Sequence, residues 1–255
     1  MRTMMGAALI FGACCEAFGQ SAPPPRAFEV ASVKPHPGPV PRIDISTSGS
    51  RLTAEAYTVL GLIMYAYNLR NDQVSRTTSL LPVGDTMYDI VAKAEGEGTP
   101  TRAEFRQMLQ SLLDDRFKLE VHSEMKEMPV YALVVGKKGP KLKESAPDAD
   151  PWAYTGGSGR NYEVTMPKAT MERLVKEISN AAFLDRPVLD KTGLTGTYDI
   201  RLTYTPENRM SRGPEPDLDV SIFTAVQEQL GLRLEAQKGI IEILVVEHLE
   251  KPSAN

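Results

Sequence analysis

Cysteine is almost absent from this chain of 255 residues, and its scarcity excludes several kinds of protein. The only two cysteines are adjacent, Cys14 and Cys15, close to the first residue. Such a pair cannot supply a disulfide framework or a cysteine-based zinc site. The region that follows must therefore be stabilised by an apolar core, and a chain of this length with 42% apolar residues can form one.

Histidine is scarce, and the chain has no excess of positive charge. The three histidines are His36, His122 and His248, and no H-E-x-x-H or H-x-H pair occurs, so the usual ligands of catalytic zinc are lacking. We expect neither a metal nor another cofactor, and we interpret His122 beside Glu124, and His248 beside Glu247, as exposed side chains near strand ends. The formal charge of −4 argues against nucleic-acid binding, because that function normally needs a basic surface.

No apolar run is long enough to cross a membrane. The run Met4–Cys15 follows the basic Arg2, and its twelve residues fall short of the ~20 that a spanning helix needs. A short apolar run behind a basic start is typical of a secretory signal peptide, here residues 1–19. Two processing sites fit: cleavage after Gly19, or lipidation of Cys14 in a lipoprotein-like box. We expect export to the periplasm or the cell exterior, with a mature chain that is either free or lipid-anchored and contains no transmembrane span.

The rest of the chain divides into a Pro-rich spacer at 20–27, a first half at 28–142, a linker loop at 143–160 and a second half at 161–255. Proline, glycine, aspartate and serine enrich the linker. Hydrophobic periodicity and capping signals predict the elements of each half. In the first half these are strands Phe28–Lys34, Ile43–Ile45, Tyr88–Ala94, Phe117–His122 and Val130–Val135, a helix within Thr53–Leu69, and a helix opened by the capping box Thr101–Glu104. In the second half they are helices opened by Thr170 and by Ser221, the latter closed by Gly231, and strands Tyr198–Ile200, Leu232–Glu235 and Ile240–Val246.

The same order of elements thus occurs twice, at an offset of about 110 residues. Tyr88-Asp89-Ile90, for example, recurs as Tyr198-Asp199-Ile200. The pattern predicts an α+β fold of two similar halves, each with helices packed on an antiparallel or mixed sheet. Internal duplication and chance recurrence within an α+β chain both explain it.

A set of segments, taken in order, resembles a known family. They are Phe28–Pro35, Tyr88–Lys93, Met108–Leu119, Pro129–Val135, Gly139–Leu142, Asp190–Asp199, Gln229–Leu232 and Glu250–Asn255. The family consists of exported proteins of soil bacteria, abundant in acidobacteria of the Solibacter type and catalogued as a domain of unknown function. The resemblance spans residues 28–255, although Leu80–Gly84 lacks the tryptophan that members usually carry there. A similar domain fused to membrane metallopeptidases of the BlaR antirepressor type implies an extracytoplasmic sensing module. The resemblance brings no catalytic or ligand-binding residue with it.

Catalytic motifs in the sequence are better explained as structure. Lys191-Thr192-Gly193 matches a β-lactamase triplet, but its partner motifs are lacking or lie between predicted strands. We interpret the Asp190–Asp199 segment as turns in which Gly193 and Gly196 adopt positive φ.

One loop has a feature that favours recognition. Trp152 and Tyr154 lie in the predicted linker, outside any periodic core pattern, and either form a recognition surface or fold back between the halves.

These patterns favour a non-catalytic extracytoplasmic module for binding, sensing or protein interaction. An envelope protein or peptide would pair by strand addition with apolar edge strands at Val130–Val135 or Ile240–Val246. The alternative is a cell-envelope hydrolase that acts on peptide or glycan through paired carboxylates. Its candidates are Asp114, Asp115, Asp190 and Asp199, which the sequence alone cannot pair.

Overall fold

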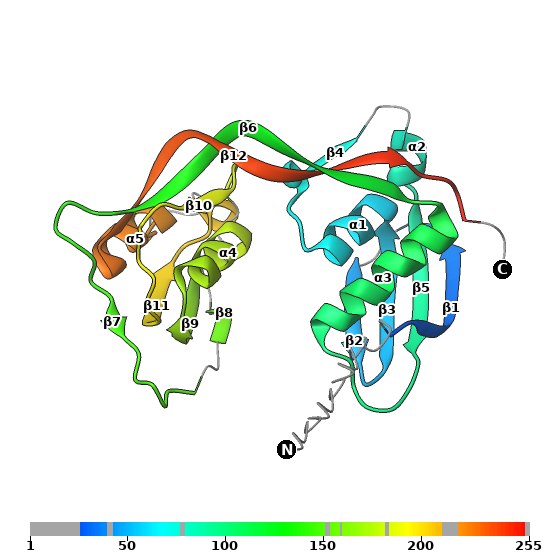
Figure 1. Ribbon diagram of the computed structural model, residues 1–255, viewed down its shortest axis with the longest axis horizontal. Helices are drawn as coiled ribbons and strands as arrows, with labels where there is room; N and C mark the ends of the chain where they lie inside the picture. The colour runs from blue at the N-terminus through cyan, green and yellow to red at the C-terminus, as the bar shows by residue number, and fades with distance from the viewer. Residues whose placement is uncertain are drawn as a thin grey trace, which may run out of the picture.

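The computed structural model describes residues 26–39, 43–76, 80–150, 154–158, 160–181, 184–210 and 219–252. Within them, five α-helices and three four-stranded sheets form two lobes joined by a long two-stranded ribbon (Figure 1). The predicted α+β class is confirmed. The predicted signal peptide 1–19, Cys14, most of the spacer and Trp152 lie outside the described residues.

The N-terminal lobe contains an antiparallel sheet with the strand order β1-β5-β3-β2. Its strands are β1 (Phe28–Pro35), β2 (Asp44–Ser48), β3 (Arg51–Thr58) and β5 (Met87–Ala94). Helices α1 (Val59–Tyr67) and α3 (Arg102–Phe117) cover one face of this sheet, and the short helix α2 (Leu81–Gly84) lies beside its end (Figure 1). A 3-10 turn, η1 (Asn71–Gln73), leads from α1 into the short strand β4 (Val74–Arg76).

The helix predicted within Thr53–Leu69 begins later than the prediction. Residues 51–58 form strand β3, in which Leu52, Ala54 and Ala56 alternate toward the core. The Thr58 hydroxyl accepts a hydrogen bond from the Gly61 N–H at 3.0 Å, which fixes the first turn of α1. The helical spacing of Leu60, Ile63, Met64 and Tyr67 lies wholly within α1, and the cap at Thr58 separates this helix from the strand before it.

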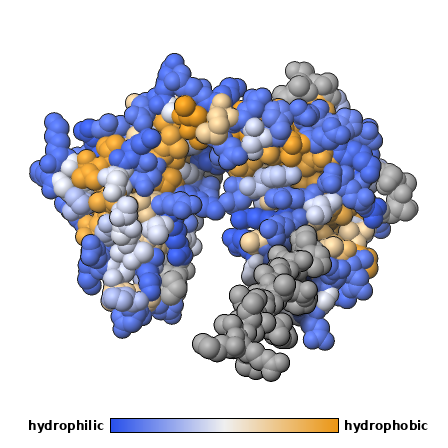
Figure 2. Space-filling view, in the orientation of Figure 1, coloured by the Kyte–Doolittle hydropathy of each residue, from blue (hydrophilic) through white to orange (hydrophobic). Residues whose placement is uncertain are grey.

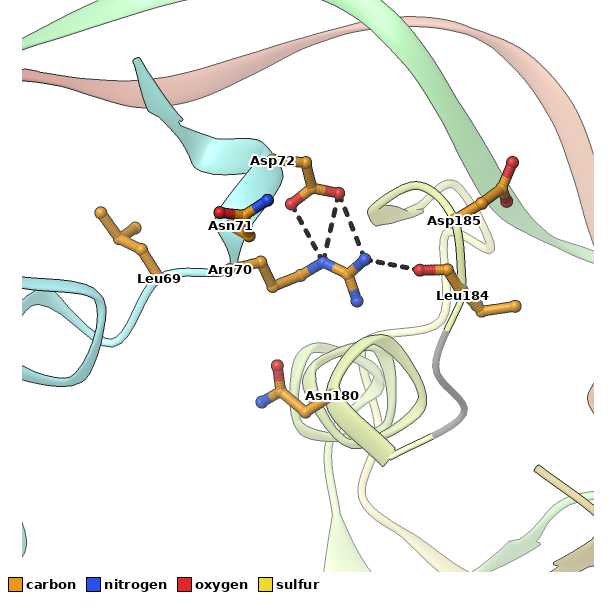
Figure 3. A pocket seen from close by; sticks show the side chains of 7 residues that line it. All are labelled: Leu69, Arg70, Asn71, Asp72, Asn180, Leu184 and Asp185. Atoms are coloured by element: carbon orange, nitrogen blue, oxygen red, sulfur yellow. Dashed lines mark hydrogen bonds and ion pairs between the residues drawn. The ribbon is translucent and has the colours of Figure 1, made fainter. Parts of the chain in front are cut away.

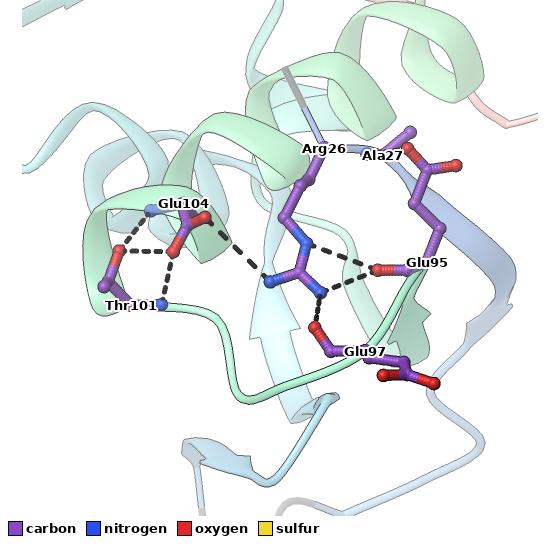
Figure 4. Close-up of polar contacts among 6 residues, drawn as sticks. All are labelled: Arg26, Ala27, Glu95, Glu97, Thr101 and Glu104. Atoms are coloured by element: carbon purple, nitrogen blue, oxygen red, sulfur yellow. Dashed lines mark hydrogen bonds and ion pairs between the residues drawn. The ribbon is translucent and has the colours of Figure 1, made fainter. Parts of the chain in front are cut away.

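Arg26, which lies just before β1, is held against the β5–α3 connection (Figure 4). The Arg26 guanidinium donates to the carbonyl oxygens of Glu95 and Glu97 at 2.8 and 2.9 Å and lies 4.0 Å from the Glu104 carboxylate. Glu104 also completes the capping box with Thr101, as predicted, because each side chain bonds the backbone N–H of the other residue.

The C-terminal lobe contains a sheet with the order β7-β11-β9-β8, also antiparallel. Its strands are β7 (Lys143–Glu144), β8 (Tyr154–Ser158), β9 (Asn161–Ala169) and β11 (Tyr198–Tyr204). Helices α4 (Met171–Ala181) and α5 (Ile222–Leu230) pack in this lobe, with β10 (Val188–Asp190) and the turn η3 (Glu207–Arg209). The prediction of a loop over 143–160 is therefore wrong for β7 and β8, since glycine and serine in β8 concealed its pairing with β9.

The ribbon between the lobes is built from β6 (Glu120–Val135) and β12 (Leu232–His248), which pair antiparallel over their length. A strand of sixteen residues spans ~50 Å at about 3.3 Å per residue. The sequence predicts two short strands in place of each long one, because the middle of β6, residues 123–127, is exposed and mostly polar.

The expectation that Val130–Val135 and Ile240–Val246 are edge strands is wrong for residues 131–133 and 244–246, which pair on both sides, and holds among the described residues for 240–243, which pair only with β6. Each segment pairs with the opposite strand of the ribbon. Residues 131–133 of β6 pair on their other side with β10, and residues 244–246 of β12 pair with β4, both in parallel. Their apolar character comes from packing in the two cores.

Each lobe has its own hydrophobic core, and each core contains residues from both long strands. Leu244 and Val246, near the end of β12, are buried in the N-terminal core, and Val121 of β6 packs against it partly buried. Leu133, near the end of β6, is buried in the C-terminal core with Leu232, the first residue of β12. The ribbon is thus part of both cores as well as a connection between them.

Candidate functional site

Most residues singled out in the sequence are spread over the surface of both lobes. Tyr154 lies on β8 with 51% of its surface exposed, whereas Trp152 is outside the described residues. Asp114 and Asp115 lie on α3, Asp190 ends β10, and Asp199 lies on β11. The structure therefore does not pair these four carboxylates across a common cavity.

The Asp190–Asp199 segment is a set of turns, as the sequence indicates. The Asp190 carboxylate accepts hydrogen bonds from the backbone N–H and the hydroxyl of Thr192 at 2.9 and 2.8 Å. Gly193 has a φ of +70°, as predicted. The prediction of positive φ is wrong for Gly196: a Cβ there would lie 2.9 Å from the Tyr198 hydroxyl, so close packing against that ring explains its glycine.

A cleft between the two lobes is a concave feature to which both lobes contribute. The space-filling view shows the surface hollowed between the lobes, beneath the ribbon (Figure 2). Two hollows of about 440 and 290 Å³ lie there and share Leu69 of the N-terminal lobe and Asn180 of the C-terminal lobe. The hollows therefore adjoin, and both lobes form their walls.

Arg70 crosses the larger hollow from one lobe to the other (Figure 3). Its guanidinium donates to the Leu184 carbonyl oxygen at 2.8 Å and to the Ser179 carbonyl oxygen at the end of α4. The Asp72 carboxylate accepts from the Arg70 Nε at 3.1 Å and so fixes the side chain from its own lobe. Arg70 and Asp72 together form a latch that ties the end of α1 to the end of α4.

The opposite wall of this hollow has its own ion pair. The Asp185 carboxylate accepts from Arg186 at 2.6 Å and from the Tyr131 hydroxyl at 3.0 Å. The hydrogen bond from Arg186 is the main cause that lowers the pKa of Asp185 below its usual value. Asp185 is therefore ionised at neutral pH and cannot act there as a general acid.

The smaller hollow lies between α1, α3 and the end of α4. Its apolar and aromatic wall comes from α1 and its approach, and its polar groups come from Asn68, Arg106 and Asn180. The Arg106 guanidinium lies over the Tyr65 ring, 5.5 Å from the ring centroid. The full lining is Tyr57, Gly61, Met64, Tyr65, Asn68, Leu69, Arg106 and Asn180.

His122 lies on the ribbon, away from this cleft, between two carboxylates. Its Nε2 is 3.1 Å from a Glu124 oxygen and its Nδ1 is 2.9 Å from a Glu247 oxygen across the strand pair. The hydrogen bond with Glu124, followed by the charges of Glu247 and Glu124, raises the pKa of His122 above 6.5. His248 contacts Glu250 in a similar way at 2.9 Å. Over the part of the chain that the structure describes, no three His, Cys, Asp or Glu side chains are grouped as a metal site.

Sequence reasoning missed the cleft residues Arg70, Arg106 and Asn180. Arg106 occupies a helix position that a periodicity analysis assigns to the polar face, and Asn180 lies in the last turn of a helix. Only Asn68 carries a local signal: it follows an apolar helical pattern and ends α1 in the left-handed conformation, at a φ of 55°.

The chain matches the family described as protein of unknown function (DUF3738) over residues 60–249, and it belongs to that family. The predicted membership in a family of unknown function is thus confirmed. No curated protein and no solved structure matches the chain. In the described residues, no helix is both long and apolar enough to cross a membrane.

Proposed function

Within this family of unknown function, we propose that the chain is a non-catalytic binding module whose ligand lies in the cleft between the lobes. The observation that carries the proposal is the pair of adjoining hollows, to which each lobe contributes walls and in which Leu69 and Asn180 are shared. Ligand sites occur preferentially in concave regions between packed units. A ligand there contacts both lobes at once.

The ionic groups of the cleft favour binding over acid–base catalysis. Asp72 is fixed by Arg70, and Asp185 is fixed by Arg186 and Tyr131. A glycosidase or acid-dependent peptidase needs a carboxyl group that holds a proton near neutral pH. The hydrogen bond from Arg186 lowers the pKa of Asp185, so Asp185 lacks that property and the hydrolase remains the weaker of the two functions.

The proposal includes export of the protein. It is supported by the basic start and the twelve-residue apolar run of the sequence, and the family resemblance implies the same. The intact mass and N-terminal sequence of the protein recovered from the envelope and the medium test it. A new terminus at Gln20 or a diacylated Cys14 supports export, and an intact Met1 in the cytosol contradicts it.

We also propose that the two halves arose by duplication of one unit. The sheet orders β1-β5-β3-β2 and β7-β11-β9-β8 correspond strand by strand in chain order, and β4 and β10 each pair in parallel with the long strand that comes from the other half. Thr58 and Thr170, 112 residues apart, each cap the following helix by accepting from the N–H three residues on. Many family members test the idea: a sequence profile of residues 43–135 is aligned with a profile of residues 154–248. If alignments that pair the elements in a different order give equal similarity, duplication is contradicted.

Hydrogen exchange with mass-spectrometric detection tests the binding function. The full chain is incubated with amino acids, short peptides and soluble glycan fragments, each at millimolar concentration. A ligand in the cleft is expected to slow hydrogen exchange in residues 57–73 and 171–181 together. If the module is non-catalytic, the same mixtures contain no reaction product of that ligand. Protection in neither segment with any compound overturns binding in the cleft, and turnover of a compound overturns the non-catalytic assignment.

Strand addition by a peptide is a second candidate, now confined to the middle of the ribbon, which includes residues 240–243 of the predicted edge segment. Within the described residues, β10 and β4 cover only the two ends of the ribbon, and Met125 and Ile240 between them are 70% and 62% exposed. A peptide that adds a strand here is expected to protect residues 237–243 and not the cleft segments. The same exchange data therefore separate the two modes.

A further inference from the structure

One positive charge in the cleft has no compensating carboxylate. Arg106 projects from α3 into the smaller hollow, and its Nε is buried without a hydrogen-bond partner. Among the described residues no carboxylate forms an ion pair with it, and the groups that influence its pKa are Tyr65 and Arg102. Burial lowers that pKa, yet an arginine keeps its charge at neutral pH.

The other arginine in the cleft lining differs in this respect. Arg70 is paired with Asp72, and Asp185 on the far wall is paired with Arg186. The charges of the larger hollow therefore cancel locally, whereas the smaller hollow keeps the charge of Arg106. The buried Nε is closed to a ligand, but Arg106 as a whole is only half-buried, so the terminal nitrogens of its guanidinium are the donors left for a ligand oxygen in the hollow.

We propose that the smaller hollow binds the carboxylate of a small ligand through Arg106, with the apolar or aromatic part of the ligand against Tyr65, Met64 and Leu69. This inference rests on the proposed binding function and names its ligand class. The planar guanidinium matches a carboxylate with two parallel hydrogen bonds. Asn68 and Asn180 lie in the same lining and offer amide groups from both lobes.

The charge and the wall favour a carboxylate over a phosphate. One arginine neutralises one negative charge, and a phosphate monoester with a charge near −2 would leave the second charge in a partly apolar hollow. The hollow of about 290 Å³ is of the size that suits a small acid. The aromatic rings of Tyr57 and Tyr65 are suited to the side chain of such an acid.

The test uses the full chain and a matched pair of probes, N-acetylphenylalanine and N-acetylphenylalanine amide, which differ in the carboxylate. Isothermal titration measures each dissociation constant for the wild type, R106Q and R201Q. Arg201 is an exposed arginine on β11, so R201Q removes an equal charge away from the hollow. The acid is expected to bind the wild type and R201Q alike, and R106Q is expected to weaken its binding roughly tenfold to a hundredfold. R106K keeps the charge but loses the planar guanidinium, so its affinity for the acid is expected to lie between those of the wild type and R106Q. Circular dichroism checks that each variant is folded.

Two results overturn the inference: equal binding of acid and amide, or equal binding of the acid by the wild type and R106Q. The inference is also overturned if the wild type does not bind the acid at millimolar concentration and 10-fold molar excess over the protein. The proposed binding function is tested separately. It fails only if no compound of the wider panel protects the cleft segments from hydrogen exchange. A neutral sugar or peptide that protects those segments while the acid does not bind would leave the cleft as a site and remove Arg106 as its anion receptor.

Discussion

Asp89 and Asp199 hold equivalent places in the two lobes. Each follows a tyrosine and precedes an isoleucine, and each carboxylate stabilises a bulge on the neighbouring strand where one residue, Ala56 or Lys168, has positive φ. The Asp89 oxygen accepts from the Ala56 N–H at 2.9 Å and from His36 at 2.9 Å. Asp199 accepts from the Ser145 hydroxyl at 2.6 Å, and that hydroxyl accepts from the Lys168 N–H. The repeated Tyr-Asp-Ile is thus a structural motif of the bulge.

Replacement of Asp89 tests this role. The D89A variant removes the acceptor from the Ala56 N–H and is expected to lower the free energy of unfolding at pH 7 by about 1–3 kcal/mol. The D89N variant keeps an acceptor oxygen and is expected to lose less. The hydrogen bond from Ala56, then that from His36, lowers the pKa of Asp89. Its ionised form therefore stabilises the fold above the unfolded-state pKa near 3.8, and this contribution is lost as the pH falls through the lower folded-state pKa.

Urea denaturation of the wild type and D89N at several pH values measures this effect. The difference in unfolding free energy at pH 7 is expected to shrink below pH ~3.8. A difference that stays constant down to pH 2 would contradict the role of the charge.

His122 is expected to titrate above its ordinary value because two carboxylates face it. A raised folded-state pKa means that the stabilising contribution is fully present below the unfolded-state pKa of ~6.5 and is lost as the pH rises through the folded-state pKa. Replacing Glu124 with glutamine removes the largest cause and is expected to shift the titration of His122 downward. NMR titration of the ring Hε1 measures it, and E250Q, which alters only the contact of His248, is the control. An unchanged His122 titration in E124Q would count against the contact.

At the scale of elements, the end of α5 depends on one glycine. Gly231 ends the helix with a φ of +66°, and a Cβ there would lie 2.4 Å from the Gly139 carbonyl oxygen and 2.7 Å from the Lys141 nitrogen. The loop that precedes β7 docks on this turn, since Lys141 N–H donates to the Leu230 carbonyl at 2.8 Å. Gly139 has a similar φ of +81°, but a Cβ there would meet nothing within 4 Å.

These two glycines form a matched pair of substitutions. The G139A variant is expected to lose about 1 kcal/mol of unfolding free energy, which reflects the backbone conformation alone. The G231A variant is expected to lose about 2–4 kcal/mol, because the backbone must also shift to admit the methyl group. Urea denaturation compares them. Equal losses would show that the close approach of the loop contributes nothing.

The helices were largely predictable because their signals are local. The capping box at Thr101, the cap at Ser221 and the left-handed Gly231 each act within one turn, and the structure confirms all three. The full extent of β6 and β12 was not predictable, because their exposed middle pairs across a sequence separation of more than 100 residues. The cleft was also not predictable from the sequence, because only the path of the ribbon brings together Arg70, Arg106 and Asn180.

At the scale of the whole molecule, both the ribbon and the Arg70 latch connect the lobes. The R70A variant removes the hydrogen bonds to Leu184 and Ser179 and leaves Asp72 without its partner. We expect a loss of about 1–3 kcal/mol of unfolding free energy, faster hydrogen exchange at the end of α4 and a larger radius of gyration. Small-angle X-ray scattering and exchange measurements check this.

R201A, which removes an exposed arginine on β11, is the control for R70A. R70K retains the charge near Asp72 but not the two-carbonyl geometry, so an intermediate result is expected. If R70A and R201A behave alike, the ribbon alone sets the distance between the lobes.

The exchange of long strands between the cores has a consequence for how the chain is made. The N-terminal core needs Leu244, Val246 and Leu249, which a ribosome adds only after the elements of the C-terminal lobe. The first half therefore emerges with an open core, which closes only when β12 has been made. Contacts of such high sequence separation fold slowly. The lobe that is synthesised first is therefore not the first to complete its core.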